Sequence, residues 1–280
     1  MNEDQVAYWN GDAGTKWAAH QDILDLTLEP LGLAAVAAAA PSTGEKILDI
    51  GCGCGATTLE LGRLVGPGGA VLGADISTPM VALAQQRAAS AGNISVLVAD
   101  AAAHGFAPGH YDLAFSRFGV MFFEDPTLAF RNIRKALKPS GRLSFVCWRG
   151  VKENIWVTSG LEVALRHVPR PEPTDPLAPG PFAFADPARV EEILGAAGFT
   201  QIKATPFDAD LMLGGKGGPD SAAEFTLEIG PVGRLLAEAS AATKQQVREE
   251  LVARYREMTN AQGHVLAKAA VWIVTAQASA

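Results

Sequence analysis

The sequence has few cysteines and fewer basic than acidic side chains. Three cysteines occur in 280 residues, and Cys52 and Cys54 are one residue apart, where a mutual disulfide would be strained. This odd, small number is typical of a reducing compartment, so we expect a cytoplasmic protein. With 23 Lys and Arg against 30 Asp and Glu, the formal net charge of -7 would repel a nucleic-acid backbone. Nucleic acid is therefore not an expected partner.

The sequence also lacks an apolar run of the roughly 20 residues that a membrane-spanning helix needs. The alanine-rich stretch 31–40 is shorter and is typical of a helix. The opening MNEDQVAYWN has no basic segment followed by an apolar one, so a secretory signal is not expected. We predict no membrane insertion, whereas the hydrophobic content of 48% is sufficient for a large buried core.

Short β-branched runs alternate with helical patterns through the first half of the sequence. We expect five strands there, at about 46–51, 70–75, 94–99, 111–116 and 142–148. The pair Thr78-Pro79 is typical of a helix start between two of them. A sixth strand is expected near 200–207, and the run AAVWIVTAQA at 269–278 favours a seventh. This pattern predicts an α/β fold with a doubly wound, mostly parallel, seven-stranded sheet and helical cap insertions.

Three segments are not needed to build this sheet. Residues 1–40 are predicted to form an N-terminal helical lid. The segment 169–187 holds seven prolines, which exclude a helix or central strand, and it forms either an ordered excursion or a flexible lid. Residues 208–268 are expected to be a helical insertion that contributes to a substrate chamber, because their apolar spacing is helical.

The sequence LDIGCGCGATT at 48–58 directly follows the first predicted strand. Gly51, Gly53 and Gly55 permit a tight turn and the close approach of a ligand, and the next helix offers free N–H groups to an anion. The same glycines also fit the dinucleotide-binding pattern G-x-G-x-x-A. The loop therefore predicts a site for an anionic group, and the glycines alone leave the ligand open.

Three aspartates narrow the identity of that ligand. Asp49 lies two residues before the first glycine, Asp75 ends the second strand and Asp100 ends the third. Because open α/β sheets bind ligands beyond the carboxyl ends of their strands, these three acids are expected to share one crevice. A ligand with an ammonium group, ribose hydroxyls and an exocyclic amine would satisfy all three.

These residues and their order resemble the class I, Rossmann-like S-adenosylmethionine-dependent methyltransferases. The opening YWNGDAGTKWAAHQ and the tryptophan that ends the fifth strand are similar to the small-molecule branch related to ubiquinone and menaquinone C-methyltransferases. The resemblance implies S-adenosyl-L-methionine as cofactor, bound by a core of 41–207 and 269–280, with S-adenosyl-L-homocysteine as product. It further implies methyl transfer to an O, N or C atom of a small, largely apolar or aromatic metabolite.

The resemblance also implies roles for individual residues. Asp49 would lie near the methionine amino group, and Asp75 would hold the ribose hydroxyls. Ile76 would lie against the adenine ring, and Trp9 in the lid would meet the sulfonium by cation–π attraction. The remaining implied cofactor contacts are Gly51, Gly53, Thr57, Thr58, Asp100, Ala101, Ser116 and Arg117.

The sequence does not assign a general base. The leading candidates are His20, in the predicted lid, and His167, beside the proline-rich segment. An isolated histidine is more often a packing or surface residue. Arg117 has two interpretations of equal weight: it binds a carboxylate or phosphate of the substrate, or it forms an ion pair that orients an acid such as Asp49. The catalytic residues are therefore left unassigned.

Two other classes of protein stay open at this stage. An NAD-dependent oxidoreductase would share the glycine turn and Asp75 but would not need Asp49, and a non-catalytic S-adenosylmethionine or nucleotide sensor would share the fold. No metal is expected, because the segment FSRFGVMFF lacks acids, and Cys52 and Cys54 are too few for a zinc site. The expected partner is a small-molecule acceptor, with a homodimer left open.

Overall fold

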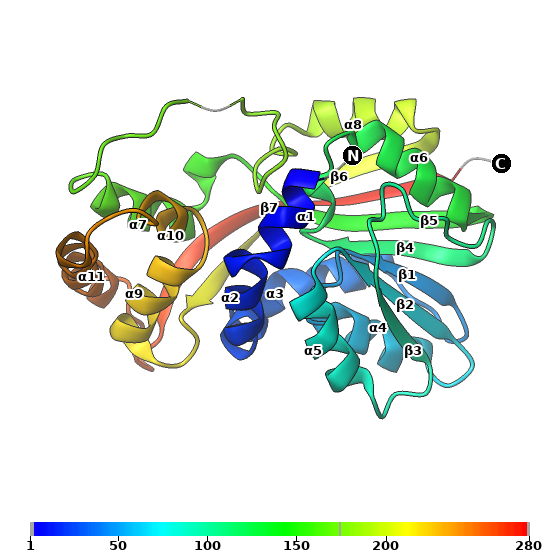
Figure 1. The fold of residues 1–280 in the computed structure, drawn as a ribbon. Coiled ribbons are helices and arrows are strands. Elements are labelled where there is room, and N and C mark those ends of the chain that lie inside the picture. Colours follow the sequence, from blue (N-terminus) through cyan, green and yellow to red (C-terminus); the bar gives the residue numbers. More distant parts are fainter. Residues whose placement is uncertain (1–2, 174, 279–280) are drawn as a thin grey trace.

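The computed structural model describes residues 3–173 and 175–278; residues 1–2, 174 and 279–280 lie outside the described part of the chain. These residues form one seven-stranded sheet in the order β3-β2-β1-β4-β5-β7-β6, flanked by helices (Figure 1). Only β7 runs antiparallel to its neighbours. The predicted doubly wound, mostly parallel sheet is confirmed. The strands are β1 (Lys46–Ile50), β2 (Ala70–Asp75), β3 (Ile94–Val98), β4 (Tyr111–Arg117), β5 (Leu137–Trp148), β6 (Phe199–Leu213) and β7 (Val265–Ala278).

The central strands are buried on both faces, which explains their continuous apolar runs in the sequence. Ile47 and Leu48 of β1, Leu113 and Phe115 of β4, and Phe145 of β5 are all 0% exposed. In the view of Figure 1, α6 and α8 lie along the top of the sheet, and α4 and α5 lie below, beside β1 to β3. The helices between β1 and β6 are α4 (Ala56–Val65), α5 (Thr78–Ala88), α6 (Pro126–Ala136), α7 (Ile155–Ala164) and α8 (Pro187–Ala196).

The last two strands are longer than the sequence predicted. Residues 208–213 and 265–268, expected to belong to the insertion, instead pair as β6 and β7 from Asp208↔Ala270 to Leu213↔Val265. Exposed acids alternate here with apolar residues, because one face of this antiparallel pair is open to water. The helical part of the insertion therefore spans 214–264.

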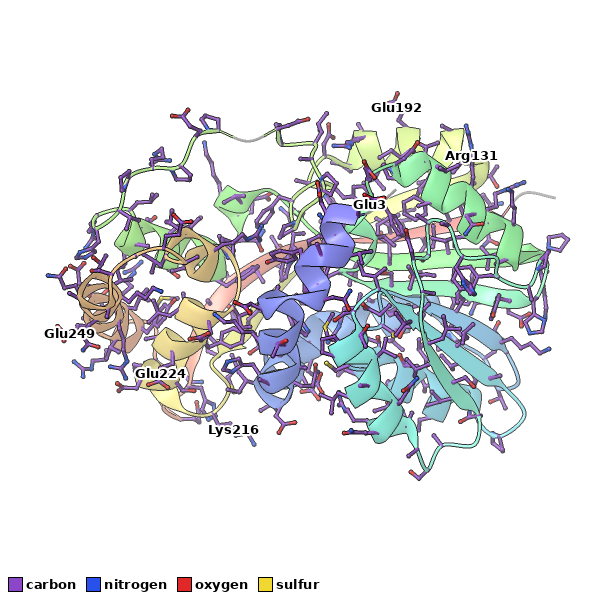
Figure 2. All side chains as sticks on the ribbon, in the orientation of Figure 1. Glu3, Arg131, Glu192, Lys216, Glu224 and Glu249 are labelled. Carbon is purple, nitrogen blue, oxygen red and sulfur yellow. The ribbon has the colours of Figure 1, made fainter. Side chains whose placement is uncertain are left out.

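The insertion contains α9 (Gly218–Glu228), α10 (Pro231–Leu235) and α11 (Ala241–Arg256). Together with α7 these helices form a separate group on the left of Figure 1, reached by the long strands β6 and β7. Their core includes Tyr255, which is 0% exposed and lies 2.8 Å from the Thr226 hydroxyl. Figure 2 shows Glu224 and Glu249 on the outer side of this group, pointing away from the rest of the molecule.

The N-terminal 40 residues divide into two parts. The long helix α3 (Gln21–Ala39) packs against β5, β6 and β7 through side chains such as Leu24 and Leu31, so it covers the sheet. The short helices α1 (Glu3–Asn10) and α2 (Asp12–Ala19) cross the centre of the view in Figure 1. We call α1 and α2 the lid.

The lid is hydrogen-bonded to the loop that follows β2. The Asn10 amide donates to the Ile76 carbonyl oxygen at 2.9 Å and accepts from the Thr78 N–H at 2.9 Å. The Ser77 hydroxyl donates to the Trp9 carbonyl oxygen at 2.7 Å. Three hydrogen bonds therefore fix the lid directly beside Asp75.

The proline-rich segment forms neither helix nor strand in its described residues 169–173 and 175–186. Its second half is nevertheless packed: the Gly180 N–H donates to the Met121 carbonyl oxygen at 3.1 Å, and the Trp272 ring donates to that of Ala185 at 2.9 Å. Phe184 is 2% exposed. Of the two predicted alternatives, the second half fits the ordered excursion, whereas Thr174 lies outside the described residues. Within the described part of the chain, we find no helix with the length and apolarity needed to traverse a bilayer.

One buried asparagine joins the end of β5 to α7 and β7. Asn154 is 0% exposed, and its side-chain oxygen accepts from the Ala270 N–H at 2.9 Å and from the Trp156 ring N–H at 3.1 Å. Its amide donates to the carbonyl oxygens of Arg149, Gly150 and Ala270. Because a buried amide with all its partners is costly to remove, this residue fixes the position of Trp156.

We predict that Asn154→Ala lowers the free energy of unfolding by about 2–4 kcal/mol, because it leaves buried backbone groups without partners. Chemical denaturation followed by circular dichroism measures the loss. Gln262→Ala, which removes an exposed amide, is the control and should change stability by less than about 0.5 kcal/mol. Equal stability of the two variants would contradict the assigned role of Asn154.

Candidate functional site

The carboxyl ends of the central strands open into a cavity of about 380 Å³. Its walls come from the sheet, the lid and the insertion, and they include many of the residues that the sequence singled out. The predicted site residues that line it are Trp9, Gly51, Gly53, Asp75, Ile76, Asp100, Ala101 and Arg117. Those that do not line it are Asp49, Thr57, Thr58, Ser116, His20 and His167.

The two glycines that line the cavity have different physical roles. A Cβ on Gly51 would stand 2.6 Å from the Gly119 Cα, so the backbones of two loops meet there and exclude any side chain. A Cβ on Gly53 would instead point into open space, with only the Met80 sulfur within 4 Å, at 3.9 Å. Both glycines have positive φ, of 64° and 54°. Gly53 therefore leaves a vacant cradle beside the cavity.

Asp75 presents its carboxylate to the cavity at the end of β2. It is 7% exposed, and its two oxygens accept from the N–H groups of Gly53 at 2.8 Å and Ser77 at 2.9 Å. Burial raises the pKa of this carboxyl, and the backbone donors oppose that rise. Because a carboxylate has about four lone-pair sites, Asp75 retains acceptor capacity for the hydroxyls of a ligand.

Asp49 lies behind the loop, and one of its oxygens has no partner. The hydroxyls of Thr57 and Thr58 donate to Oδ2 at 3.0 and 2.7 Å. The other oxygen, Oδ1, is buried without any hydrogen-bond partner, and the residue is 0% exposed. Burial raises the pKa of Asp49 to about 6, against the lowering effect of the two threonines. An orphaned buried carboxylate oxygen suits a cationic ligand group.

Arg117 lines the cavity at the end of β4 and has no hydrogen-bonding partner among the described residues. Its nearest acid on α3, Asp25, pairs with Arg87 at 2.6 Å instead. The ion pair to Asp49 that the sequence left open is not formed within 4 Å, although Asp25 and Asp49 both act on its charge over a longer range. Desolvation lowers the pKa of the Arg117 guanidinium. Its donors are therefore available to an anion.

Neither candidate histidine reaches the cavity. His20 lies between α2 and α3, and the His167 Nε2 atom is 2.9 Å from Glu250 Oε1 on α11. No histidine lines the cavity in the part of the chain described.

Two further predicted site residues make hydrogen bonds to backbone N–H groups. The Ser116 hydroxyl accepts from the Gly119 N–H at 3.2 Å and so supports the turn after β4. Asp100 lines the cavity and accepts from the Ala102 N–H at 2.9 Å.

Aromatic side chains form two groups around the cavity. In the lid, the Trp9 ring makes edge contacts with Trp17 at 5.7 Å and Phe122 at 5.3 Å between ring centroids. On the opposite side, the Phe118 and Trp148 rings are stacked at 4.2 Å with an interplanar angle of 9°. These rings make most of the wall apolar.

Sequence reasoning missed several cavity residues that the tertiary structure adds. Phe118 lines the cavity, and its φ of 63° is unusual for a bulky side chain. Glu228 and Arg234 of the insertion also line the cavity, and no local motif marks them. In the sequence, only the prediction that the insertion contributes to a substrate chamber pointed to these two residues.

The described residues contain no group of three or more His, Cys, Asp or Glu side chains that could hold a metal ion. Cys52 and Cys54 are free and buried, and burial raises the pKa of both thiols.

The chain was compared with known proteins. Residues 47–141 match the family described as "Methyltransferase domain". The nocamycin O-methyltransferase of Saccharothrix syringae is 33% identical over 184 residues, which are 61% of this chain and 65% of that protein. The ubiquinone/menaquinone biosynthesis C-methyltransferase UbiE of Pseudomonas paraeruginosa is 36% identical over 104 residues, 36% of this chain and 41% of that protein. The resemblance found in the sequence is confirmed.

A solved structure gives the same result for the fold. Haemonchus contortus phosphoethanolamine N-methyltransferase 2, in complex with phosphomonomethylethanolamine and S-adenosylhomocysteine, aligns with a TM-score of 0.53 at 21% identity. The alignment covers 90% of this chain and 53% of that chain. At this identity the likeness shows the fold alone. This chain spans less than two thirds of each of the two sequence relatives.

The buried carboxyl of Asp49 predicts a specific pH dependence of stability. Its pKa is about 6 in the folded protein and 3.8 ordinarily, so the folded state holds this proton more tightly than the unfolded state. This contribution favours folding below about pH 4 and is lost as the pH rises through about 6, by about 3 kcal/mol in total. Wild type should therefore lose that much stability relative to Asp49→Asn between pH 4 and pH 7.

Denaturation curves measured at several pH values test this difference, because the other acids are retained in both proteins. Asp22→Asn, which neutralises an exposed acid on α3, is the control and should follow the wild-type profile. Parallel profiles of wild type and Asp49→Asn would contradict the assignment of a destabilised carboxylate at this position.

Proposed function

We propose that this chain, whose residues 47–141 belong to the methyltransferase-domain family, is an S-adenosylmethionine-dependent methyltransferase acting on a small, largely apolar or aromatic metabolite. The observation that carries the proposal is the set of unsatisfied groups beside the cavity. Asp49 Oδ1 lacks a partner, the Arg117 guanidinium lacks an acid, and Gly53 leaves a cradle open. Together these groups match a ligand with an amino-acid end.

The amino-acid end of the cofactor fits two of these groups. A zwitterion needs an acceptor for its ammonium group and a donor for its carboxylate. Asp49 and Arg117 supply one of each, and they lie close enough to influence each other electrostatically. The planar donor fork of Arg117 suits a carboxylate. We assign Asp49 to the ammonium and Arg117 to the carboxylate, with Thr57 and Thr58 holding Asp49 in place.

The adenosine end fits the neighbouring strand ends. Asp75 keeps free lone pairs for the two ribose hydroxyls, while its backbone donors fix its orientation. Ile76 is positioned to lie against the adenine ring, and Asp100 with Ala101 to bind the adenine edge. Trp9 of the lid covers this half of the cavity, because its backbone is bonded to Ser77.

The protein's contribution to methyl transfer is alignment and exclusion of water. When bound, S-adenosyl-L-methionine supplies a methyl group already activated by the sulfonium charge. Holding two reactants in reactive geometry contributes up to about 7–11 kcal/mol to catalysis. The aromatic rings of Trp9, Trp17 and Phe122 add apolar surface to the cavity wall. We assign no general base, because neither His20 nor His167 lines the cavity.

The relatives support this function over the alternatives. The names of the two relatives specify an O-methyltransferase and a C-methyltransferase, which supports an O or C atom as the acceptor in this chain. An oxidoreductase would share the glycine loop and Asp75, but it would have no use for Asp49 and Arg117 as a pair. The net charge of -7 argues against a nucleic-acid substrate, and three free, buried cysteines support a reducing, cytoplasmic location.

The assignment of Asp75 predicts the effect of its removal. Asp75→Ala should weaken S-adenosylmethionine and S-adenosylhomocysteine alike by about 1.5–3 kcal/mol, because charged hydrogen bonds to the ribose are lost in both. Isothermal calorimetry measures both affinities, with Asp22→Ala as the control. Unchanged affinity for both ligands would remove Asp75 from the site.

The open cradle at Gly53 predicts a steric effect. Gly53→Val should abolish binding of S-adenosylhomocysteine, because the new side chain would occupy the space beside the cavity. Gly44→Val is a matched control: Gly44 also has positive φ, of 86°, and a Cβ there meets nothing within 4 Å. Both variants carry similar backbone strain and should melt cooperatively. Wild-type binding by Gly53→Val would mean that the loop is only a structural turn.

A further inference from the structure

The cavity extends beyond the glycine loop into a second part, built largely from segments outside the central strands. We call this part the acceptor chamber and define it by Phe118, Trp148, Trp156, Leu211, Phe225 and Arg234. Thr27 of α3 also lies along this wall, but its hydroxyl already donates to the Met212 carbonyl oxygen at 2.8 Å. The interior of the chamber is therefore almost wholly apolar.

Three aromatic rings give the chamber flat walls. Phe118 and Trp148 are stacked nearly parallel, and Trp148 lies 4.7 Å from Trp156 between ring centroids. Phe118 has a left-handed backbone, with φ of 63°, which bulky residues rarely adopt. Such strain is found where a side chain must be held in one place for function. Flat aromatic surfaces favour a planar, conjugated guest.

The charged side chains at the cavity mouth differ in whether they have a partner of opposite charge. Lys16 of the lid pairs with Glu228 of α9 at 2.9 Å, so these two charges compensate each other. Asp12 lies in the first turn of α2, where a negative charge stabilises the helix. Arg234 of α10 has no acidic partner within 4 Å among the described residues. It is therefore the cation of the mouth that is available to a guest.

The surroundings of Arg234 leave its hydrogen-bond donors accessible. Its guanidinium carbon lies over the Tyr8 ring of the lid, 5.7 Å from the centroid. A cation–π contact of this kind uses none of the guanidinium N–H groups as hydrogen-bond donors to protein oxygens, and the side chain is exposed. These donors form no hydrogen bond within the described part of the chain. The group is thus oriented by an aromatic ring and still lacks an anion.

The backbone that carries Arg234 is held rigidly. On the other side of α10, Val232 and Leu236 are 2% and 1% exposed. Between them, Gly233 packs so closely that a Cβ would stand 2.7 Å from the Leu227 carbonyl oxygen. The position of the Arg234 backbone is therefore set by buried packing, which a specificity-determining residue requires.

We propose that the methyl acceptor is a planar aromatic metabolite that carries a carboxylate, and that Arg234 binds this carboxylate at the mouth of the chamber. The ring system lies against Phe118, Trp148 and Trp156, and the carboxylate meets the N–H edge of Arg234. This inference rests on the proposed methyltransferase function and specifies its substrate class. Arg234 acts in recognition, whereas Asp49, Asp75 and Arg117 serve the cofactor.

The experiment uses two probes of the same shape that differ in charge, 2-naphthoate and its neutral amide 2-naphthamide. Each is titrated into the full-length protein saturated with S-adenosylhomocysteine, and binding is followed by quenching of tryptophan emission and by calorimetry. We expect wild type to bind the naphthoate roughly three- to tenfold more tightly, as for an exposed charged contact. This preference should shrink in high salt, because exposed charges are screened.

The variants separate recognition from structural support. Arg234→Gln should abolish the preference for naphthoate and leave the affinity for naphthamide unchanged, and Arg234→Lys should restore part of the preference. Arg256→Gln, an equal change of charge at an exposed position ending α11, should behave as wild type. Trp156→Ala should weaken both probes, because it removes part of the flat wall.

Any of four results would overturn the inference. Wild type could show no preference or bind neither probe, Arg234→Gln could retain the preference, or it could weaken both probes equally, which would indicate that Arg234 only supports the lid through Tyr8. The proposed function is tested separately, because S-adenosylhomocysteine is first titrated alone. If it fails to bind, the methyltransferase proposal fails, and the two probes titrated without it still decide the role of Arg234.

Discussion

The arrangement of the site depends on a direct contact between two backbones, at Gly51 after β1 and Gly119 after β4. A Cβ on either residue would stand within 2.8 Å of backbone atoms of the other loop. Because the loops can meet, Gly53 is placed on one side of the contact, and Arg117 and Phe118 on the other. The hydrogen bond from the Gly119 N–H to Ser116 fixes the same turn. Without this contact the two halves of the cavity would not share one space.

A second constraint is electrostatic: the site holds buried charges that the protein itself does not fully compensate. Asp49 has an orphaned oxygen and a raised pKa, and Arg117 lies apart from any acid that could pair with it. Buried charges of this kind reduce the stability of the free protein. We propose that a zwitterionic ligand compensates both charges at once, so that stability lost in folding is recovered as binding affinity. In this proposal, the same two groups lower the stability of the free protein and bind the ligand.

The lid and the insertion close the cavity through contacts of different kinds. The lid is held to the core by two hydrogen bonds beside Asp75: the Asn10 amide donates to the Ile76 carbonyl oxygen, and the Ser77 hydroxyl donates to the Trp9 carbonyl oxygen. It is held to the insertion by exposed contacts, the Lys16–Glu228 ion pair and the Arg234–Tyr8 stacking. Exposed ion pairs contribute little and are easily broken. We therefore expect the mouth to open on the side of the insertion, while the lid stays attached beside Asp75.

The sequence by itself determined the sheet and the edge of the sheet at which the glycine loop lies. Strand periodicity located all seven strands, and the order of Asp49, the glycine loop and Asp75 indicated that they share one sheet edge, because parallel strands end together. Such features are local, so a short window of sequence contains them. The lengths of β6 and β7, the covering role of α3 and the contact of Arg234 with Tyr8 were decided only by the tertiary structure. Tyr8 and Arg234 come into contact because distant segments pack together, and no pattern within either segment predicts that contact.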